Sequence, residues 1–343
     1  MTTPRLSPMI PLWLILSVTL VLLVLWLAVA AWVIGARLAH DRLVRVRRRD
    51  AGLLDLGVDA GHWSRRRLRR TAGGEPSSGA AKAAHELVRR NGPRLRRLAQ
   101  RRNHHDRAHA LRVLARGGSR FAFDLLRNAY ANGSPDVRAA VVAIAAEQER
   151  PEADDLLLDI LVTGAHPRSR TATELAPRAR RLLSELVTLT GDHDHEVRYW
   201  ALMLLRHVAD DDRAKAAAVA GSVDPSGMVR AAAARVLGAS HAQDVQHVVR
   251  ALIADDVFFV RSHAARAAGE IGAGSLAGDI AALLVDANWW VRAAAKETLF
   301  LLGDSGLRAA TEMLENEDGF ARDSAREVVS AFRRESRPLE LAG

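Results

Sequence analysis

A Val-Arg dipeptide returns at regular intervals through the second half of the chain. Its arginines are Arg198, Arg230, Arg261 and Arg292, and the same spacing reaches further arginines at Arg107, Arg138, Arg168 and Arg322. Successive arginines of this set lie 30 to 32 residues apart. Units of one length, each too short to be a domain, indicate a solenoid in which every unit packs on its neighbours.

Each unit carries the signals of two short helices. An aspartate stands six residues before the arginine in four units, and we expect it in a turn or as a helix N-cap. From the valine onward, apolar residues recur at the spacing of one buried helical face, as between Val197 and Val208. Gly118, Gly272 and Gly303 follow eleven residues after the arginine, where a helix can stop.

Composition agrees with helices. Aromatic residues make up only 5% of the chain, and Ala, Leu, Val and Arg dominate, which disfavours β-sandwiches and barrels. We therefore predict an all-α fold: an α-solenoid of about eight helix-pair repeats of ~31 residues over residues 82–335, preceded by one transmembrane helix.

The pattern Asp … Val-Arg … Ala-Ala … Leu-Gly resembles HEAT repeats, especially the short, alanine-rich type similar to phycobilisome-lyase HEAT-like repeats. The resemblance covers roughly residues 84–335. It implies a structural ladder that joins neighbouring repeats through Asp192, Asp224, Asp255, Asp286, Arg198, Arg230, Arg261 and Arg292. The pattern weakens around Arg168, where Pro167, Arg170 and Glu174 fall on the face that should be apolar, so we expect this repeat to be irregular and to act as a bend.

The transmembrane helix is expected at residues 12–34, inside a run without charged residues or histidine. At ~1.5 Å per residue this segment would span roughly 34 Å, enough for a hydrocarbon core of about 30 Å. Trp13 and Trp32 stand at its ends, as interfacial aromatics do. A cleaved signal peptide ending near Ala28–Ala30 is the alternative, but the apolar run is longer than is usual for one.

Basic residues on the C-terminal side of this segment set the expected orientation. They are Arg37, Arg42, Arg45, Arg47, Arg48 and Arg49. The positive-inside bias places residues 1–11 outside and the solenoid in the cytoplasm, as a single-pass protein of the cell membrane. The same arginines can contact anionic lipid headgroups. Residues 35–70 would form this basic juxtamembrane segment, residues 71–81 a flexible linker, and residues 336–343 a C-terminal tail.

Charge is unevenly divided, which bears on the partners. Residues 1–120 carry a net charge of +17, whereas residues 121–343 carry −8. An acidic solenoid argues against nucleic-acid binding, because that function needs a basic face. We therefore expect a protein partner, such as another membrane protein, and no nucleic acid.

Several classes of enzyme lack their sequence signatures. The chain has no cysteine, and it has no phosphate-binding loop, nucleophile elbow or dinucleotide fingerprint. Among HEAT-like proteins, the deoxyhypusine hydroxylase type places His-Glu pairs directly after the repeat arginine, but here His85-Glu86 and His195-Glu196 are out of that register. Two histidine clusters could hold a metal, and we expect both to be structural or solvated: His104, His105 and His109 around Asp106, and His193 with His195. We expect no catalytic activity, no cofactor and no metal.

The candidate binding surface combines aromatic and basic residues of the later repeats. Aromatics occupy the places three and two residues before the repeat arginine, at Phe258, Phe259, Trp289, Trp290 and Phe320. Residues off the core-facing positions of the following helices are expected to line an adjoining groove: Tyr199, Met203, Arg206, Arg235, Arg266 and Lys296. Exposed aromatics beside arginines are typical of interface hot spots. The alternative is that the aromatics only pack against the next repeat.

The resulting hypothesis is a membrane-anchored scaffold that binds a protein partner through its cytoplasmic solenoid. The alternative is an enzyme, or a lyase-like accessory subunit of a membrane-associated enzyme, that uses the solenoid groove. An enzyme would need convergent titratable groups in one cleft, and the aligned repeats show none.

Overall fold

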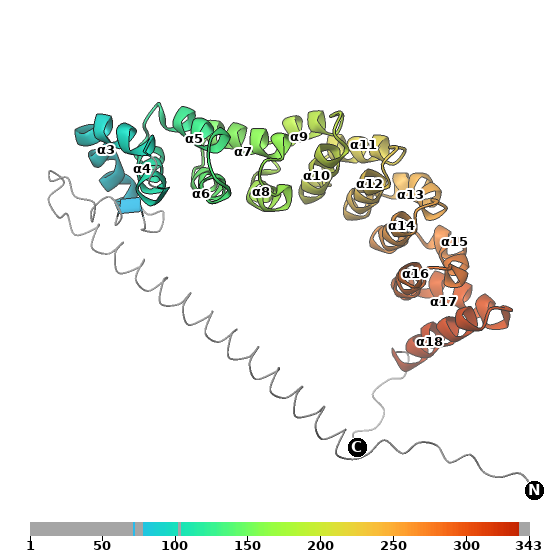
Figure 1. Ribbon diagram of the computed structural model, residues 1–343. Coiled ribbons are helices and arrows are strands. Elements are labelled where there is room, and N and C mark those ends of the chain that lie inside the picture. The colour runs from blue at the N-terminus through green and yellow to red at the C-terminus, as the bar shows by residue number, and fades with distance from the viewer. Residues whose placement is uncertain (1–70, 73–77, 102–103, 336–343) are drawn as a thin grey trace, which may run out of the picture. The chain divides into compact units, whose positions relative to one another are not determined.

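The computed structural model describes residues 71–72, 78–101 and 104–335, and the chain divides into two compact units between Gln148 and Glu149. Apart from turns and short 3-10 segments, the described residues are helical. The predicted all-α solenoid is therefore confirmed for this part of the chain (Figure 1). The expected transmembrane segment, its flanking arginines and the two tails lie outside the described residues.

The described part of the first unit includes α3 (Ser78–Ala99), α4 (His104–Arg116), α5 (Ala122–Ala131) and α6 (Pro135–Ala146). Helix α3 is kinked at Asn91, which has non-helical backbone angles two residues before Pro93. Its packing against α4 buries Leu87, Leu95 and Leu111.

Both ends of the expected linker at residues 71–81 are among the described residues. Residues 78–81 belong to α3. Thr71 and Ala72 are buried, and the Arg116 guanidinium donates to their carbonyl oxygens at 3.1 and 3.3 Å. The same guanidinium pairs with Glu147, the C-cap residue of α6, at 2.8 Å. This one arginine therefore joins Thr71 and Ala72 to the end of α6.

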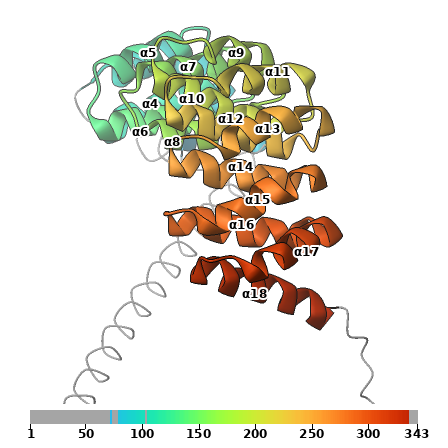
Figure 2. The same ribbon diagram turned by 90° about the vertical axis from the view of Figure 1, so that its right-hand side faces the viewer.

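The second unit stacks helix pairs in two layers. One layer contains α7 (Pro151–Thr163), α9 (Leu183–Leu189), α11 (Asp212–Gly221), α13 (Gln246–Ile253), α15 (Ala277–Ala282) and α17 (Gly303–Glu312). The other contains α8 (Arg168–Leu175), α10 (His195–Leu205), α12 (Gly227–Ala239), α14 (Phe258–Glu270), α16 (Trp289–Leu301) and α18 (Gly319–Glu335). Figure 2 shows α14, α16 and α18 stacked one below another. The second layer, which we call the inner layer, lies on the inside of the curve that α8 to α18 follow (Figure 1).

Small residues explain the close packing of this layer. Helices α12 and α14 bury Ala232, Ala233, Ala264 and Ala265 almost completely. A Cβ added at Gly238 would lie 2.9 Å from the backbone of Ala267 on the next helix, so nothing larger than glycine fits there without a shift. Alanine and glycine thus set the spacing between repeats.

Helix ends follow the expected glycines. Gly118, Gly272 and Gly303 have φ angles of 72°, 65° and 59°, the left-handed conformation that glycine adopts without strain. In the repeat of Arg230, the residue eleven positions after the arginine is His241, which has a positive φ of 51°. Its Nδ1 lies 2.8 Å from the carbonyl oxygen of Glu270, a hydrogen bond that helps to hold the less favourable conformation.

The repeat at Arg168 is irregular, as predicted. Helix α8 has only eight residues and passes into a 3-10 turn at Ala176–Arg178, which contains Pro177. The buried carboxylate of Asp154, on α7, binds Arg181 at 2.6 and 2.7 Å and Arg178 at 3.1 Å. An ion cluster replaces the apolar contact of the regular repeats at this level.

Candidate functional site

A ladder of arginines and aspartates fixes the turns that lead into the inner layer. The Arg261 guanidinium donates from Nε and Nη2 to the two carboxylate oxygens of Asp286, at 2.7 and 3.0 Å. Its Nη1 donates to the carbonyl oxygens of Asp255 and Asp256, at 2.8 and 3.0 Å. One side chain therefore joins two successive turns.

The same geometry recurs in the two preceding repeats. Arg198 binds Asp224 at 2.7 and 2.8 Å, and Arg230 binds Asp255 at 2.7 and 2.8 Å. Arg230 also reaches the exposed carboxylate of Asp256 at 3.0 Å. These contacts are those that the HEAT resemblance implied for the middle of the ladder.

The ladder differs from that expectation at both ends. Arg168 pairs with Asp194, at 2.6 Å, and with Glu196 rather than with Asp192. Asp192 lies only 24 residues beyond Arg168, whereas the partners elsewhere stand 25 or 26 residues on. At the other end, Asn316 occupies the aspartate position, and Arg292 has no carboxylate partner in the described part of the chain.

The aspartates also shape the turns, but not as N-caps. The side chains of Asp224, Asp255 and Asp286 accept a hydrogen bond from the backbone N–H two residues on, at 2.8 to 2.9 Å. The N-cap itself is two residues further along, for example at Asn288. These aspartates therefore form Asx turns, as turn residues, and the N-cap residue follows them.

Charge pairing outweighs burial at these carboxylates. Burial by itself would raise the pKa of Asp286, but the hydrogen bonds from Arg261 and from the N–H of Asn288 lower that pKa below its usual value. The pKa of Asp224 and that of Asp255 are lowered by the same balance. All three ladder carboxylates are therefore charged at neutral pH.

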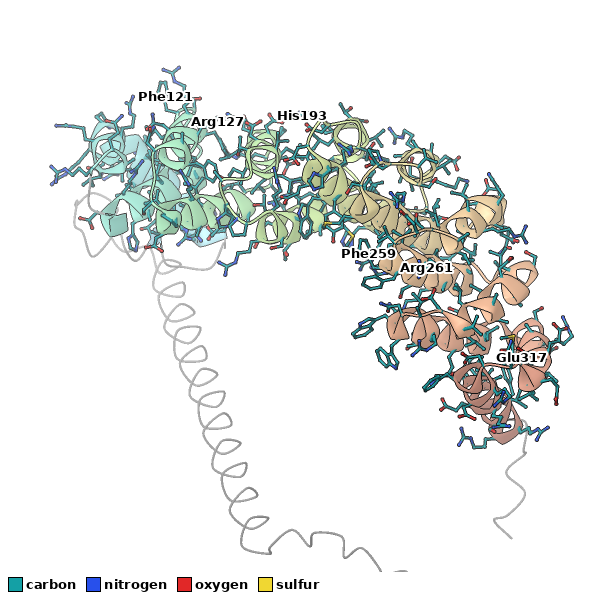
Figure 3. All side chains as sticks on the ribbon, turned by 45° about the vertical axis from the view of Figure 1, so that its right-hand side comes forward. Phe121, Arg127, His193, Phe259, Arg261 and Glu317 are labelled. Carbon is teal, nitrogen blue, oxygen red and sulfur yellow. The ribbon has the colours of Figure 1, made fainter. Side chains whose placement is uncertain are left out.

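The aromatic residues beside this ladder are exposed to solvent. Phe258, Trp289, Trp290 and Phe320 retain 40%, 59%, 58% and 72% of their accessible surface. Phe259 is half-buried, because its ring faces the Cα side of Gly227 on α12. We call these five residues the aromatic ridge. Figure 3 labels Phe259 and Arg261 near the start of α14.

The rings of the ridge contact one another in pairs. Trp289 and Trp290 meet edge to face with centroids 4.7 Å apart, and Phe258 and Phe259 meet similarly at 5.5 Å. The Arg292 guanidinium lies 5.6 Å from the ring centroid of Phe320. The ridge thus follows the N-terminal ends of α14, α16 and α18.

The predicted groove residues fall into separate places. Tyr199 packs edge to face on Trp200 and borders a pocket of about 410 Å³ with Arg168 and Glu196. Lys296 pairs with Glu327 and borders a groove of about 850 Å³ between α16 and α18. Met203 is half-buried on α10. Arg206, Arg235 and Arg266 come from three successive inner-layer helices.

Three residues near these places were not singled out from the sequence. Phe300 and Leu301 line the groove beside Lys296, and Leu301 is exposed. His263 lies half-buried between arginines on α14. A comparison of equivalent positions across the aligned repeats would have found Leu301, because it stands where the three preceding repeats have His207, Ala239 and Glu270.

The two histidine clusters are only partly among the described residues. In the described part of the chain, no group of three or more His, Asp or Glu residues could hold a metal ion. His193 is exposed, with its Nδ1 3.1 Å from Asp192, and His195 lies 3.8 Å from Asp194. The side chains of His104 and His105 lie outside the described residues, and Asp106 beside them is buried.

A search of the described helices for membrane spans found none of sufficient length and apolar character. The expected span at residues 12–34 and the arginines at positions 37–49 are not among the residues searched.

Comparison with known proteins supports the HEAT assignment. Residues 216–299, which include α12 and α14, match the family described as HEAT repeats. These residues therefore have the sequence of HEAT repeats as well as their helix-pair structure. No curated protein matches the chain.

Solved structures of low identity share the helical-repeat form. An archaeal HEAT-like repeats protein from Thermococcus onnurineus is 15% identical, with a TM-score of 0.35, over 71% of this chain and 97% of that one. Human deoxyhypusine hydroxylase is 15% identical, with a TM-score of 0.31, over 75% and 100%. Kap95p, solved with RanGDP, is 12% identical, with a TM-score of 0.49, over 80% and 44%. At these TM-scores the likenesses carry no argument about function.

Proposed function

We propose that this protein is a membrane-anchored HEAT-repeat scaffold that binds a protein partner through the aromatic ridge of its solenoid. The single observation that carries the proposal is the exposure of the ridge. Four large aromatic side chains at successive repeat ends are open to solvent in a chain with few aromatics. Clustered exposed aromatics are rare on monomers and common at interfaces.

The energetics favour covering this surface. Each aromatic side chain buries ~150–250 Å² when enclosed. About half of the ridge is still open, so a partner would remove on the order of 500 Å² of apolar surface from water, worth roughly 10 kcal/mol before the costs of association. The rigid ladder beneath the ridge supports it, because a preorganised surface loses little entropy on binding.

We propose a binding role rather than a catalytic one. The ladder carboxylates are already occupied by guanidinium groups, and the ridge presents apolar rings. Such a surface can hold a partner but offers no group to move a proton or attack a substrate.

The test is partner capture by the full-length chain from membranes of the source cells. Trp289→Ala with Trp290→Ala should lose the captured protein while the melting temperature changes by less than ~3 °C. Val219→Ala with Val223→Ala removes exposed apolar surface outside the ridge and serves as the matched control. Equal capture by the tryptophan variant and the control would refute the proposal.

We also propose that residues 12–34 anchor the chain with the solenoid in the cytoplasm and the basic segment at anionic headgroups. The apolar run and the arginines that follow it support this placement. Protease added to intact cells should spare residues 84–335 and cut them only after the membrane is opened. Digestion of the solenoid in intact cells would reverse the orientation.

A further inference from the structure

Three arginines of the inner layer come from helices that pack side by side, and none of them has a close carboxylate partner among the described residues. They are Arg206 at the end of α10, Arg235 on α12 and Arg266 on α14. In the residues that the structure describes, Arg206 and Arg235 form no ion pair. Arg266 has only a long contact with Glu297, 3.5 Å between Nε and the carboxylate.

Two other cations of the same layer are paired. Lys296 binds Glu327, and Arg326 binds Asp323 at 2.8 Å. The ladder arginines Arg198, Arg230 and Arg261 are held by aspartates, whereas Arg292 is held by two backbone carbonyl oxygens. Arg206, Arg235 and Arg266 add positive charge to α10, α12 and α14, in a part of the chain that is acidic as a whole.

The charges of the three guanidinium groups all affect His263. Burial lowers the pKa of His263 to about 4, and repulsion from Arg235, Arg266 and Arg206 adds to that effect. Three side chains from three helices therefore act on one imidazole. At neutral pH that imidazole is uncharged, so the arginines supply the positive charge of the cluster.

The cluster adjoins the aromatic ridge along α14. Phe259 and His263 are four residues apart, and His263 and Arg266 are three apart, so all three lie on one face of the helix. Apolar rings and guanidinium groups thus follow each other within about two helical turns.

We propose that Arg206, Arg235 and Arg266 bind carboxylates of an acidic segment of the protein partner, whose neighbouring apolar side chain lies on the aromatic ridge. This inference rests on the proposed function and names the chemistry of the partner. Guanidinium groups bind carboxylates in two parallel hydrogen bonds, which adds direction as well as charge.

A peptide fits this surface better than a nucleic acid or a lipid bilayer. Three cations from successive helices of the inner layer can contact two or three carboxylates of a narrow chain. The surrounding negative charge repels a long polyanion or an anionic membrane, both of which need an extended basic face.

The test uses the full-length chain and a fluorescein-labelled decapeptide in which acidic residues surround two phenylalanines. A control peptide carries Asn and Gln in the acidic places. We expect the acidic peptide to bind and the control peptide to bind at least about tenfold more weakly. Arg206→Gln with Arg235→Gln should weaken binding of the acidic peptide about tenfold, at an unchanged melting temperature.

The matched control variant is Arg250→Gln with Arg308→Gln, which removes the same charge from exposed positions of α13 and α17. It should change the affinity less than about twofold. Equal binding of both peptides, no binding of either, or equal loss in both variants would overturn the inference. Preferential binding of a phosphatidylglycerol vesicle or an oligonucleotide to the same arginines would also overturn it.

Failure of this inference and failure of the proposed function can be told apart. If the acidic peptide does not bind but Trp289→Ala with Trp290→Ala still abolishes partner capture, the inference is wrong and the scaffold function stands. If the tryptophan variant captures the partner normally, the scaffold function through the ridge is wrong regardless of the peptide.

Discussion

Removal of one ladder carboxylate should destabilise the stack by an amount that the geometry sets. Asp286→Ala deletes the two oxygens that receive Arg261 at 2.7 and 3.0 Å and the acceptor for the N–H of Asn288 at 2.8 Å. Arg261 keeps only its bonds to the carbonyl oxygens of Asp255 and Asp256. The variant thus leaves a guanidinium that is mostly buried and half satisfied.

The size of the effect follows from these contacts. A hydrogen bond to a charged group is worth about 1.5–3 kcal/mol net, and loss of one partner of a buried ion pair costs about 3–5 kcal/mol. Because the Arg261 side chain is 19% exposed, water can replace part of the loss. We expect Asp286→Ala to lower the free energy of unfolding by about 2–4 kcal/mol.

The chain offers a matched control at the next repeat. Asn316 makes the same Asx turn, to the N–H of Asp318 at 2.9 Å, but its side chain holds no arginine. Asn316→Ala should therefore cost only about 0.5–1.5 kcal/mol. The difference between the two losses of unfolding free energy gives the contribution of the Arg261–Asp286 ion pair.

Urea unfolding followed by circular dichroism measures the global change, and hydrogen exchange of the turns at residues 286–288 and 316–318 measures the local one. Neighbouring repeats couple in a solenoid, so exchange should increase most in α14 and α16 for Asp286→Ala. Costs for the two variants within about 0.5 kcal/mol of each other would refute the ladder's contribution to stability.

Three further predictions concern other parts of the molecule. Asn316→Asp places a carboxylate 24 residues beyond Arg292, the separation at which Asp192 does not pair with Arg168, so the free energy of unfolding should change by less than about 0.5 kcal/mol, as measured in urea. Because the pKa of His263 is about 4 in the folded protein and about 6.5 in the unfolded chain, protons bind the unfolded chain first, so stability should fall as pH drops from about 6.5 to about 4. After discounting for partial exposure the loss is about 1–2 kcal/mol, and His263→Gln should remove that slope from urea titrations at a series of pH values. Trp289→Ala with Trp290→Ala should cost less than about 1 kcal/mol in the same assay, since both rings are more than half exposed; a larger cost would mean that they support the core.

Several helix ends of the solenoid could be predicted from the positions of glycine, a residue type that is common where helices end. Glycine eleven residues after the repeat arginine predicted helix ends at Gly118, Gly272 and Gly303, and all three glycines have the left-handed φ angles that are common at helix C-termini. His241 adopts the same conformation, which the sequence did not predict because this residue is not a glycine. Its hydrogen bond to Glu270, 29 residues away, is a tertiary contact that no local pattern encodes.

The partner of Arg168 shows why part of the ladder was not predictable. The segment DHDHE offers several acidic residues within a few positions, so the motif alone pointed to Asp192. In the structure Arg168 binds Asp194, which lies 26 residues further on, as Asp224 does from Arg198.

Exposure of the ridge likewise needed the structure. The sequence places the aromatics at equivalent repeat positions but cannot distinguish rings packed on the next repeat from rings open to solvent. The ring of Phe259 is partly packed on a neighbouring repeat, because Gly227 leaves space for it. The rings of Trp289 and Trp290 are open to solvent.

Photo-crosslinking from the ridge tests the central claim most directly. A photoreactive phenylalanine analogue would replace Trp290 in the full-length chain, and a second chain would carry it in place of Val219, an exposed residue of α11 in the other layer. Irradiation in membranes of the source cells should give one dominant protein adduct from position 290 and none of that mass from position 219. The same adducts from both positions, or no protein adduct from position 290, would contradict a partner-binding ridge.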